Sequence, residues 1–172
     1  MGLPTKDEEH LKQKGIVYFD TPYKQEWQVR INAFRVGDSQ YYSDGLTSQF
    51  YFDEKAAILD TYGPYILLPK SLSSTIMKKL QYGKAKIESK NGLMLGPCDP
   101  TDYNALSFFV NDRYFVQLDP KSFVIDIGLT NGKCLVAIQP NTNEDFVLGE
   151  PFFRNFLSVF DDENNMFGLL PR

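Results

Sequence analysis

One loop of the sequence combines residue types that could carry out chemistry. Asp60 and Thr61 directly follow the apolar run Ala57–Leu59. A carboxylate in a loop can act on a water molecule as general base or general acid, and two neighbouring carboxylates divide these roles because like charges cannot both ionise. Asp60 is the one acidic residue of the sequence in this context. Asp60 is therefore a candidate for acid-base chemistry on a water molecule.

A second aspartate, Asp126, has similar neighbours. It follows the apolar pair Val124–Ile125 and lies two positions before Gly128, but Ile127 stands where Asp60 is followed by a hydroxyl residue. We interpret this segment as a strand that leaves Asp126 facing solvent or in a turn, without a catalytic role.

The sequence has few residues that could build a metal centre. His10 is the single histidine, and Cys98 and Cys134 are the two cysteines. A tetrahedral metal site needs four ligands and a Ser-His-Asp triad needs a suitable histidine, so both lack candidates. We expect no metal and no cofactor.

The composition predicts one compact, sheet-rich domain. At 172 residues and 42% apolar content, the chain is long enough to bury one substantial core. Its 14 Phe and 10 Tyr fall in runs such as Gln49–Phe52 and Ser107–Val110, and aromatic side chains suit a pleated surface. We divide the chain into an exposed polar arm at residues 1–15 and one domain at residues 16–172.

Charge and hydropathy exclude two kinds of partner. The net charge is −4 and the basic residues are scattered, whereas nucleic-acid binders concentrate Lys and Arg on one face, so we expect no nucleic-acid partner. No apolar run approaches the roughly 20 residues that cross a bilayer, so we expect no transmembrane segment.

The cellular compartment depends on where the native chain begins. If Met1 is the native start, the polar stretch Met1–Lys14 is no signal peptide, which favours an intracellular protein.

Local patterns predict short strands and few helices. Trp27–Asn32 alternates apolar and polar residues like a half-buried strand, and Val36–Ser39 predicts a turn. A helix is predicted at Ser71–Tyr82, with Ser71 as N-cap and Gly83 as its stop. Pro151–Phe156 predicts a second, shorter helix, because proline suits a first turn. The helical apolar stripe consists of Leu72, Ile76, Met77 and Leu80.

Taken together, these segments resemble the C-terminal lobe of pepsin-like aspartic proteases. Ala57–Gly63 is similar to the segment that carries the family's Asp-Thr/Ser-Gly motif, and Phe146–Glu150 to the apolar-apolar-Gly segment that crosses behind it in a psi-shaped structure. Val159–Asp161 and Gly168–Pro171 are similar to the family's closing strands. The resemblance covers residues 16–171 and implies a mainly β fold, a single lobe of the pepsin-like acid protease fold with one or two short helices.

The resemblance also implies roles for individual residues. Asp60 would be a catalytic half-site completed by a partner, and the Thr61 hydroxyl would bond across to the opposite lobe. The psi-shaped structure would contain Val147, Leu148 and Gly149. Cys98 and Cys134 stand where this lobe often carries a disulfide; they would be thiols in a reducing compartment and would close a long loop in an oxidising one.

The sequence departs from the family at chemical positions. Tyr62 stands where the motif has glycine, and Pro64 where the family typically has Thr or Ser. A phenol ring there would compete for space with substrate or the opposite lobe, although Gly63 could restore local flexibility. We interpret Tyr62, Gly63, Pro64 and Tyr65 as packing or interface residues and expect Asp60 to be held by backbone N–H groups.

Three functions are consistent with this sequence. The first is a non-catalytic lobe that acts as a structural or interaction subunit of a larger assembly, with its inter-lobe face covered by another chain or a homodimer mate. The second is an aspartic-type endopeptidase completed by homodimerisation or by a separate N-terminal lobe. The third is a peptide-binding module that holds an extended peptide without cleaving it.

Overall fold

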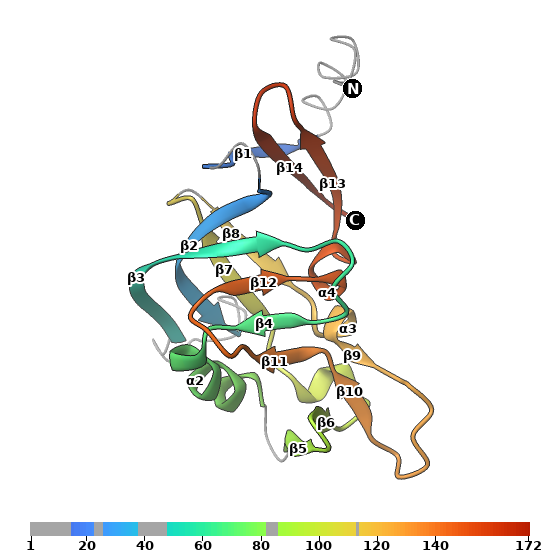
Figure 1. Cartoon of the computed structure of the whole chain (residues 1–172). Coiled ribbons are helices and arrows are strands. Elements are labelled where there is room, and N and C mark those ends of the chain that lie inside the picture. Colours follow the sequence, from blue (N-terminus) through green and yellow to red (C-terminus); the bar gives the residue numbers. More distant parts are fainter. Residues whose placement is uncertain (1–14, 23–25, 38–47, 82–85, 113) are drawn as a thin grey trace.

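The computed structural model describes residues 15–22, 26–37, 48–81, 86–112 and 114–172 (Figure 1). The predicted arm at residues 1–15 lies outside these ranges except for Gly15, and so do Tyr82 and the predicted helix stop Gly83. Strands dominate the described residues and form three sheets, so the fold is mainly β, in the form of a single lobe.

The largest sheet has seven strands in the order β11-β4-β12-β3-β2-β7-β8. Most neighbours are antiparallel, but β12 runs parallel to β3 and β11 runs parallel to β4. Its strands are β2 (Gln28–Val36), β3 (Ser48–Leu59), β4 (Ile66–Leu68), β7 (Leu106–Val110), β8 (Tyr114–Leu118), β11 (Ile138–Pro140) and β12 (Phe146–Leu148).

Two smaller sheets lie at opposite ends of the large one in Figure 1. One has the order β1-β14-β13, with β1 (Val17–Asp20), β13 (Phe156–Asp161) and β14 (Met166–Pro171). The other has the order β5-β6-β10-β9, with β5 (Glu88–Lys90), β6 (Leu93–Gly96), β9 (Val124–Ile125) and β10 (Cys134–Val136).

Aromatic side chains fill the core where the predicted aromatic runs form strands. Phe34, Phe108 and Phe146 are fully buried. The Phe108 and Phe146 rings meet edge to face with centroids 5.4 Å apart, and Phe34 stacks on Phe50 at 4.8 Å. Such pairs stabilise a fold beyond the area that they bury, so they join β2, β3, β7 and β12 into one unit.

The predicted strand Trp27–Asn32 corresponds to a longer strand, β2, which begins one residue later, at Gln28. Val29 and Ile31 are buried and Arg30 is exposed, as the alternation predicts. Gln28 is also buried, and β2 continues to Val36, where the expected turn begins at Gly37 with φ of 93°.

The helix α2 (Lys70–Leu80) confirms most of the predicted apolar stripe, because Ile76, Met77 and Leu80 are buried, whereas Leu72 is half-buried against the core. The predicted N-cap was wrong: Pro69 occupies that position, and its own side chain makes no capping hydrogen bond. Ser71 instead donates from its backbone N to Glu144 Oε1 at 3.1 Å, so a distant carboxylate replaces the local cap.

The short helices differ from the prediction in number and length. Helix α4 covers Glu150–Phe153 and not Pro151–Phe156. It ends early because Phe156 already pairs with Pro171 in the β13–β14 ladder. Helix α3 (Pro120–Phe123) and the 3-10 turn η1 (Pro100–Asp102) were not predicted.

Candidate functional site

The Asp60 loop crosses the end of β12. Strand β12 lies between β3 and β4, with Leu148 opposite both Leu59 and Ile66. The chain that leaves β3 must therefore pass over β12 to reach β4. Asp60 N donates to Leu148 O at 3.1 Å, and Glu150 N donates to Gly63 O at 2.7 Å. Residues 60–65 and Val147, Leu148 and Gly149 thus form one crossed structure.

Gly149 makes this crossing possible because it has no side chain. A Cβ at Gly149 would lie 2.2 Å from Tyr65 O and 2.4 Å from Gly63 O. Contacts this short with backbone atoms do not occur in real structures, so the loop could not keep this path over any other residue. The sequence pattern Val147-Leu148-Gly149 therefore has a direct steric cause.

Two backbone N–H groups hold the Asp60 carboxyl group. Tyr62 N and Gly63 N each donate to Asp60 Oδ1 at 3.0 Å. A Cβ on Gly63 would come within 2.7 Å of Asp60 Oδ2. The hydrogen bonds of Asp60 in the described part of the chain involve backbone groups and not a second carboxyl group.

The other predicted site residues line the same loop with different exposure. Tyr62 is 96% exposed, so its ring projects into solvent, while its backbone N lies 3.0 Å from Asp60 Oδ1. Thr61 and Pro64 are also exposed, while Gly63 and Tyr65 are half-buried. Glu150 follows Gly149, and its Oε1 accepts a hydrogen bond from Arg154 Nη2 at 2.7 Å.

Apolar residues that were not predicted as site residues connect this loop to the three-stranded sheet. Leu59 N donates to Trp27 O at 2.8 Å, and the Trp27 ring meets the Phe160 ring edge to face at 4.9 Å. Phe160 and Ile58 each remain 36% exposed. Trp27 and Phe160 were predicted as strand residues, but their contact depends on how the start of β2, which Trp27 precedes, packs against β13.

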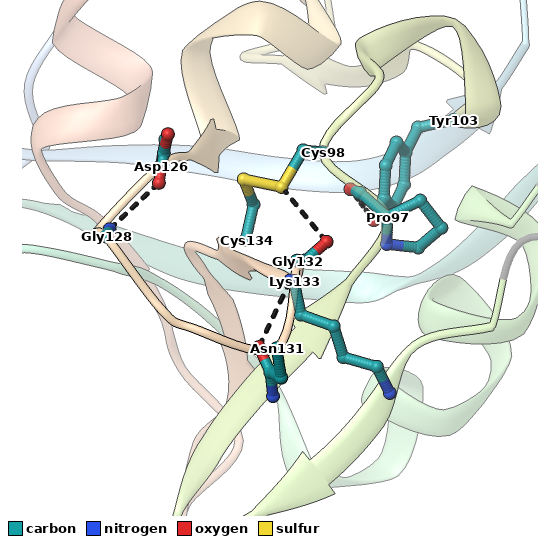
Figure 2. The surroundings of a disulfide bond; sticks show 9 residues. All are labelled: Pro97, Cys98, Tyr103, Asp126, Gly128, Asn131, Gly132, Lys133 and Cys134. Atoms are coloured by element: carbon teal, nitrogen blue, oxygen red, sulfur yellow. Dashed lines mark hydrogen bonds between the residues drawn. A yellow bond between two sulfur atoms is a disulfide. The ribbon is translucent and has the colours of Figure 1, made fainter.

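Asp126 lies outside this site, as predicted. It is exposed just after β9, and its Oδ1 accepts a hydrogen bond from Gly128 N at 2.8 Å, so it holds a turn (Figure 2). The structure gives Asp126 a local structural role.

Cys98 and Cys134 form a disulfide bond (Figure 2). Their Cα atoms are 4.9 Å apart, and Cys134 lies opposite Gly96 in the β6–β10 ladder. Cys134 is buried and Cys98 is exposed. The bond therefore fastens the loop after β6 to β10, away from the residues of the Asp60 loop.

The described residues lack the elements of two other kinds of site. They contain no group of three or more His, Cys, Asp or Glu side chains that could hold a metal ion. No helix in this part of the chain is long and apolar enough to cross a membrane.

Comparison with known proteins identifies the relatives of this lobe. The family model of eukaryotic aspartyl proteases matches residues 5–171. Gastricsin of Callithrix jacchus is 29% identical over an alignment of 163 residues, and the match covers 90% of this chain and 38% of that protein. Gastricsin of Homo sapiens is 28% identical with the same coverage, and aspartic protease 17 of Caenorhabditis elegans is 24% identical over 158 residues.

The chain spans 38% of the length of these gastricsins. Its match to the family model extends over nearly all of its residues, and its described part folds as one mainly β lobe with the crossed Asp60 loop. The chain belongs to the eukaryotic aspartyl protease family and has a pepsin-like fold.

Proposed function

We propose that this lobe is non-catalytic and serves as a structural or interaction subunit of a larger protein assembly. The observation that carries the proposal is the exposure of Tyr62, a residue that is 96% exposed and whose backbone N binds Asp60 Oδ1. Aspartic proteolysis holds a water molecule between two carboxylates, which needs open space in front of each. A phenol ring next to that space obstructs a second carboxylate or a substrate.

The hydrogen bonds of Asp60 support a structural role for its carboxyl group. Oδ1 accepts from both Tyr62 N and Gly63 N in this tight loop, and Gly63 N also donates to the backbone O of Asp60 at 3.3 Å. Each such bond stabilises a fold by about 0.5–1.5 kcal/mol, and a charged acceptor contributes at the upper end. Asp60 therefore has a reason to be present without catalysis.

The surroundings of Tyr62 favour a protein partner. Ile58, Tyr62 and Phe160 are exposed around the end of β3 and on β13. Tyrosine and other aromatic residues are enriched at the centres of protein interfaces, where they bury large areas at a small entropic cost. We infer that another chain of a complex or a homodimer mate covers these residues.

Replacement of Tyr62 by Asp tests this function. The variant and the wild type would be purified gently from the native cell and cross-linked, and the partners identified by mass spectrometry. We expect Tyr62→Asp to lose the partner that wild type retains. Tyr51→Asp is the matched control, because Tyr51 is 73% exposed on β3 at a distance along the strand from Asp60. Equal partner recovery by all three proteins would refute the proposal.

The intact crossing of the Asp60 loop over Gly149 favours one alternative, an aspartic-type endopeptidase. It would require a second carboxylate from a homodimer mate or a separate N-terminal lobe. This alternative predicts cleavage of extended peptides at acidic pH, with all activity lost in Asp60→Asn. Activity that survives in Asp60→Asn excludes it, and saturable binding without products would indicate a peptide-binding module.

A further inference from the structure

An apolar groove of about 390 Å³ lies apart from the Asp60 loop. One wall is the stretch Tyr114–Gln117 of β8, and the opposite wall includes Val17 and Phe19 of β1. Leu169 and Pro171 of β14 extend that opposite wall. The volume falls within the range of about 300–1,000 Å³ that is usual for ligand sites.

Consecutive residues of β8 line the groove, and this places the groove beside the edge of that strand. Successive side chains of a strand point to opposite faces of its sheet. A groove that touches Tyr114, Phe115, Val116 and Gln117 in succession therefore runs along the strand and not over one face.

Strand β8 is an edge of the seven-stranded sheet and, within the described residues, pairs with β7 alone. Every second N–H and C=O of such a strand points away from its neighbour and is available to another strand. The groove thus presents a row of backbone hydrogen-bonding groups opposite an apolar wall.

The apolar wall is one face of the three-stranded sheet. Val17 and Phe19 alternate along β1, and Leu169 and Pro171 alternate along β14, so each pair points to one side. At one end of the groove the Phe19 and Tyr114 rings meet edge to face, with centroids 6.0 Å apart. Tyr114 remains 50% exposed there.

We propose that this groove binds an extended peptide segment of a partner protein. The segment adds a strand to the free edge of β8 and directs apolar side chains toward β1 and β14. This site uses none of the residues of the Asp60 loop, so it goes beyond the function proposed above.

Charges next to the groove specify the peptide further. Within the described lining, Asp119 and Arg172 carry one charge of each sign. The Arg35 guanidinium lies 4.5 Å from the ring centroid of Phe115 and is occupied by that contact. The net charge of −4 over the whole chain then favours a peptide with Lys or Arg beside its apolar residues.

Hydrogen exchange with a synthetic peptide tests the proposal. The probe is a blocked nonapeptide of alternating Val and Thr with Lys at both ends. We expect it to slow amide exchange within Tyr114–Leu118 and to leave Asp60–Tyr65 unchanged.

Two N-methylated versions of this peptide serve as controls. One is methylated at the Val residues and the other at the Thr residues. One of them should lose binding, because only every second amide of an added strand faces β8. Protection confined to Asp60–Tyr65, no protection, or equal binding of all three peptides would overturn the proposal.

Two variants locate the binding site. Tyr114→Ala removes an aromatic contact at the groove and should weaken binding roughly tenfold, whereas Tyr51→Ala, exposed on β3, should bind as wild type does. Gln117→Lys adds a positive charge at an exposed residue of the groove lining and should weaken the Lys-ended peptide while strengthening a Glu-ended one. The Gln117 result decides the question if Tyr114→Ala does not fold, and unchanged affinities for both peptides would refute the site.

Discussion

Gly63 lies directly against the carboxyl group of Asp60. Its backbone N donates to Oδ1 at 3.0 Å, and a Cβ at Gly63 would stand 2.7 Å from Oδ2. The same residue therefore both holds the carboxylate and leaves space for it. In the aspartic protease motif that we compare with this loop, the glycine comes one position earlier, where this chain has Tyr62.

Gly63→Ala should destabilise the lobe because the new methyl group forces the Asp60 side chain to rotate. Rotation breaks the bonds from Tyr62 N and Gly63 N, and we expect a loss of about 1–2 kcal/mol in the free energy of unfolding. Urea unfolding measures this loss. In an Asp60→Ala background the methyl group meets no carboxylate, so Gly63→Ala should then cost much less. Additive effects of the two substitutions would contradict this explanation.

Gly149→Ala should be more damaging than any change in the loop above it. The added Cβ would overlap Tyr65 O and Gly63 O, which are backbone atoms and cannot move without displacing the crossing. We expect a loss of about 3 kcal/mol or more in thermal or chemical unfolding. Gly92→Ala is the control, because a Cβ at Gly92 would meet no atom within 4 Å. Its positive φ of 78° should therefore be the one source of strain, and we expect a loss of about 1 kcal/mol in the free energy of unfolding. Equal losses would argue against the steric role of Gly149.

Local patterns predicted the elements whose side chains alternate between core and solvent. The helical spacing of Ile76, Met77 and Leu80 identified α2, because burial against one sheet imposes that period. A different local signal, an N-cap aspartate followed by proline at Asp119–Pro120, could have identified α3. Asp119 Oδ1 accepts from Lys121 N at 2.8 Å, and Pro120 occupies the first turn.

Long-range contacts set the features that the sequence did not reveal. The start of α2 depends on Glu144, and the end of α4 depends on the pairing of Phe156 with Pro171. The groove beside β8 depends on how β1 packs against it. The Asp60 loop was predicted from a family resemblance and not from periodicity, since six residues between two strands carry no repeating pattern.

Glu144 should make stability depend on acid pH. Hydrogen bonds from Ser71, together with the Lys55 ammonium group, hold the pKa of Glu144 below its ordinary value of 4.5. The folded chain therefore releases this proton more readily than the unfolded one. Its contribution is complete above pH 4.5 and is lost as the pH falls through the lower, folded pKa.

Glu144→Gln should reduce this dependence. We expect the difference in unfolding free energy between wild type and variant to be largest near neutral pH and to shrink below pH 4.5. Glu163→Gln is a suitable control, because Glu163 is an exposed turn residue of the β13–β14 hairpin. If the difference in unfolding free energy between wild type and Glu144→Gln stays constant with pH, Glu144 contributes by packing alone.

Reduction of the Cys98–Cys134 bond should lower stability chiefly through the unfolded chain. Cys134 is already held by the β6–β10 ladder, so the folded lobe keeps its neighbours when the bond opens. The unfolded chain gains the freedom of a loop with a sequence separation of 36, which corresponds to about 4 kcal/mol in the chain-entropy model. Chemical unfolding with and without a thiol reductant measures this difference, and the exposed Cys98 gives the reductant access. The double variant Cys98→Ser, Cys134→Ser should match the reduced wild type and respond to no reductant. If oxidised and reduced wild type unfold at the same denaturant concentration, the bond does not restrict the unfolded chain as its loop length predicts.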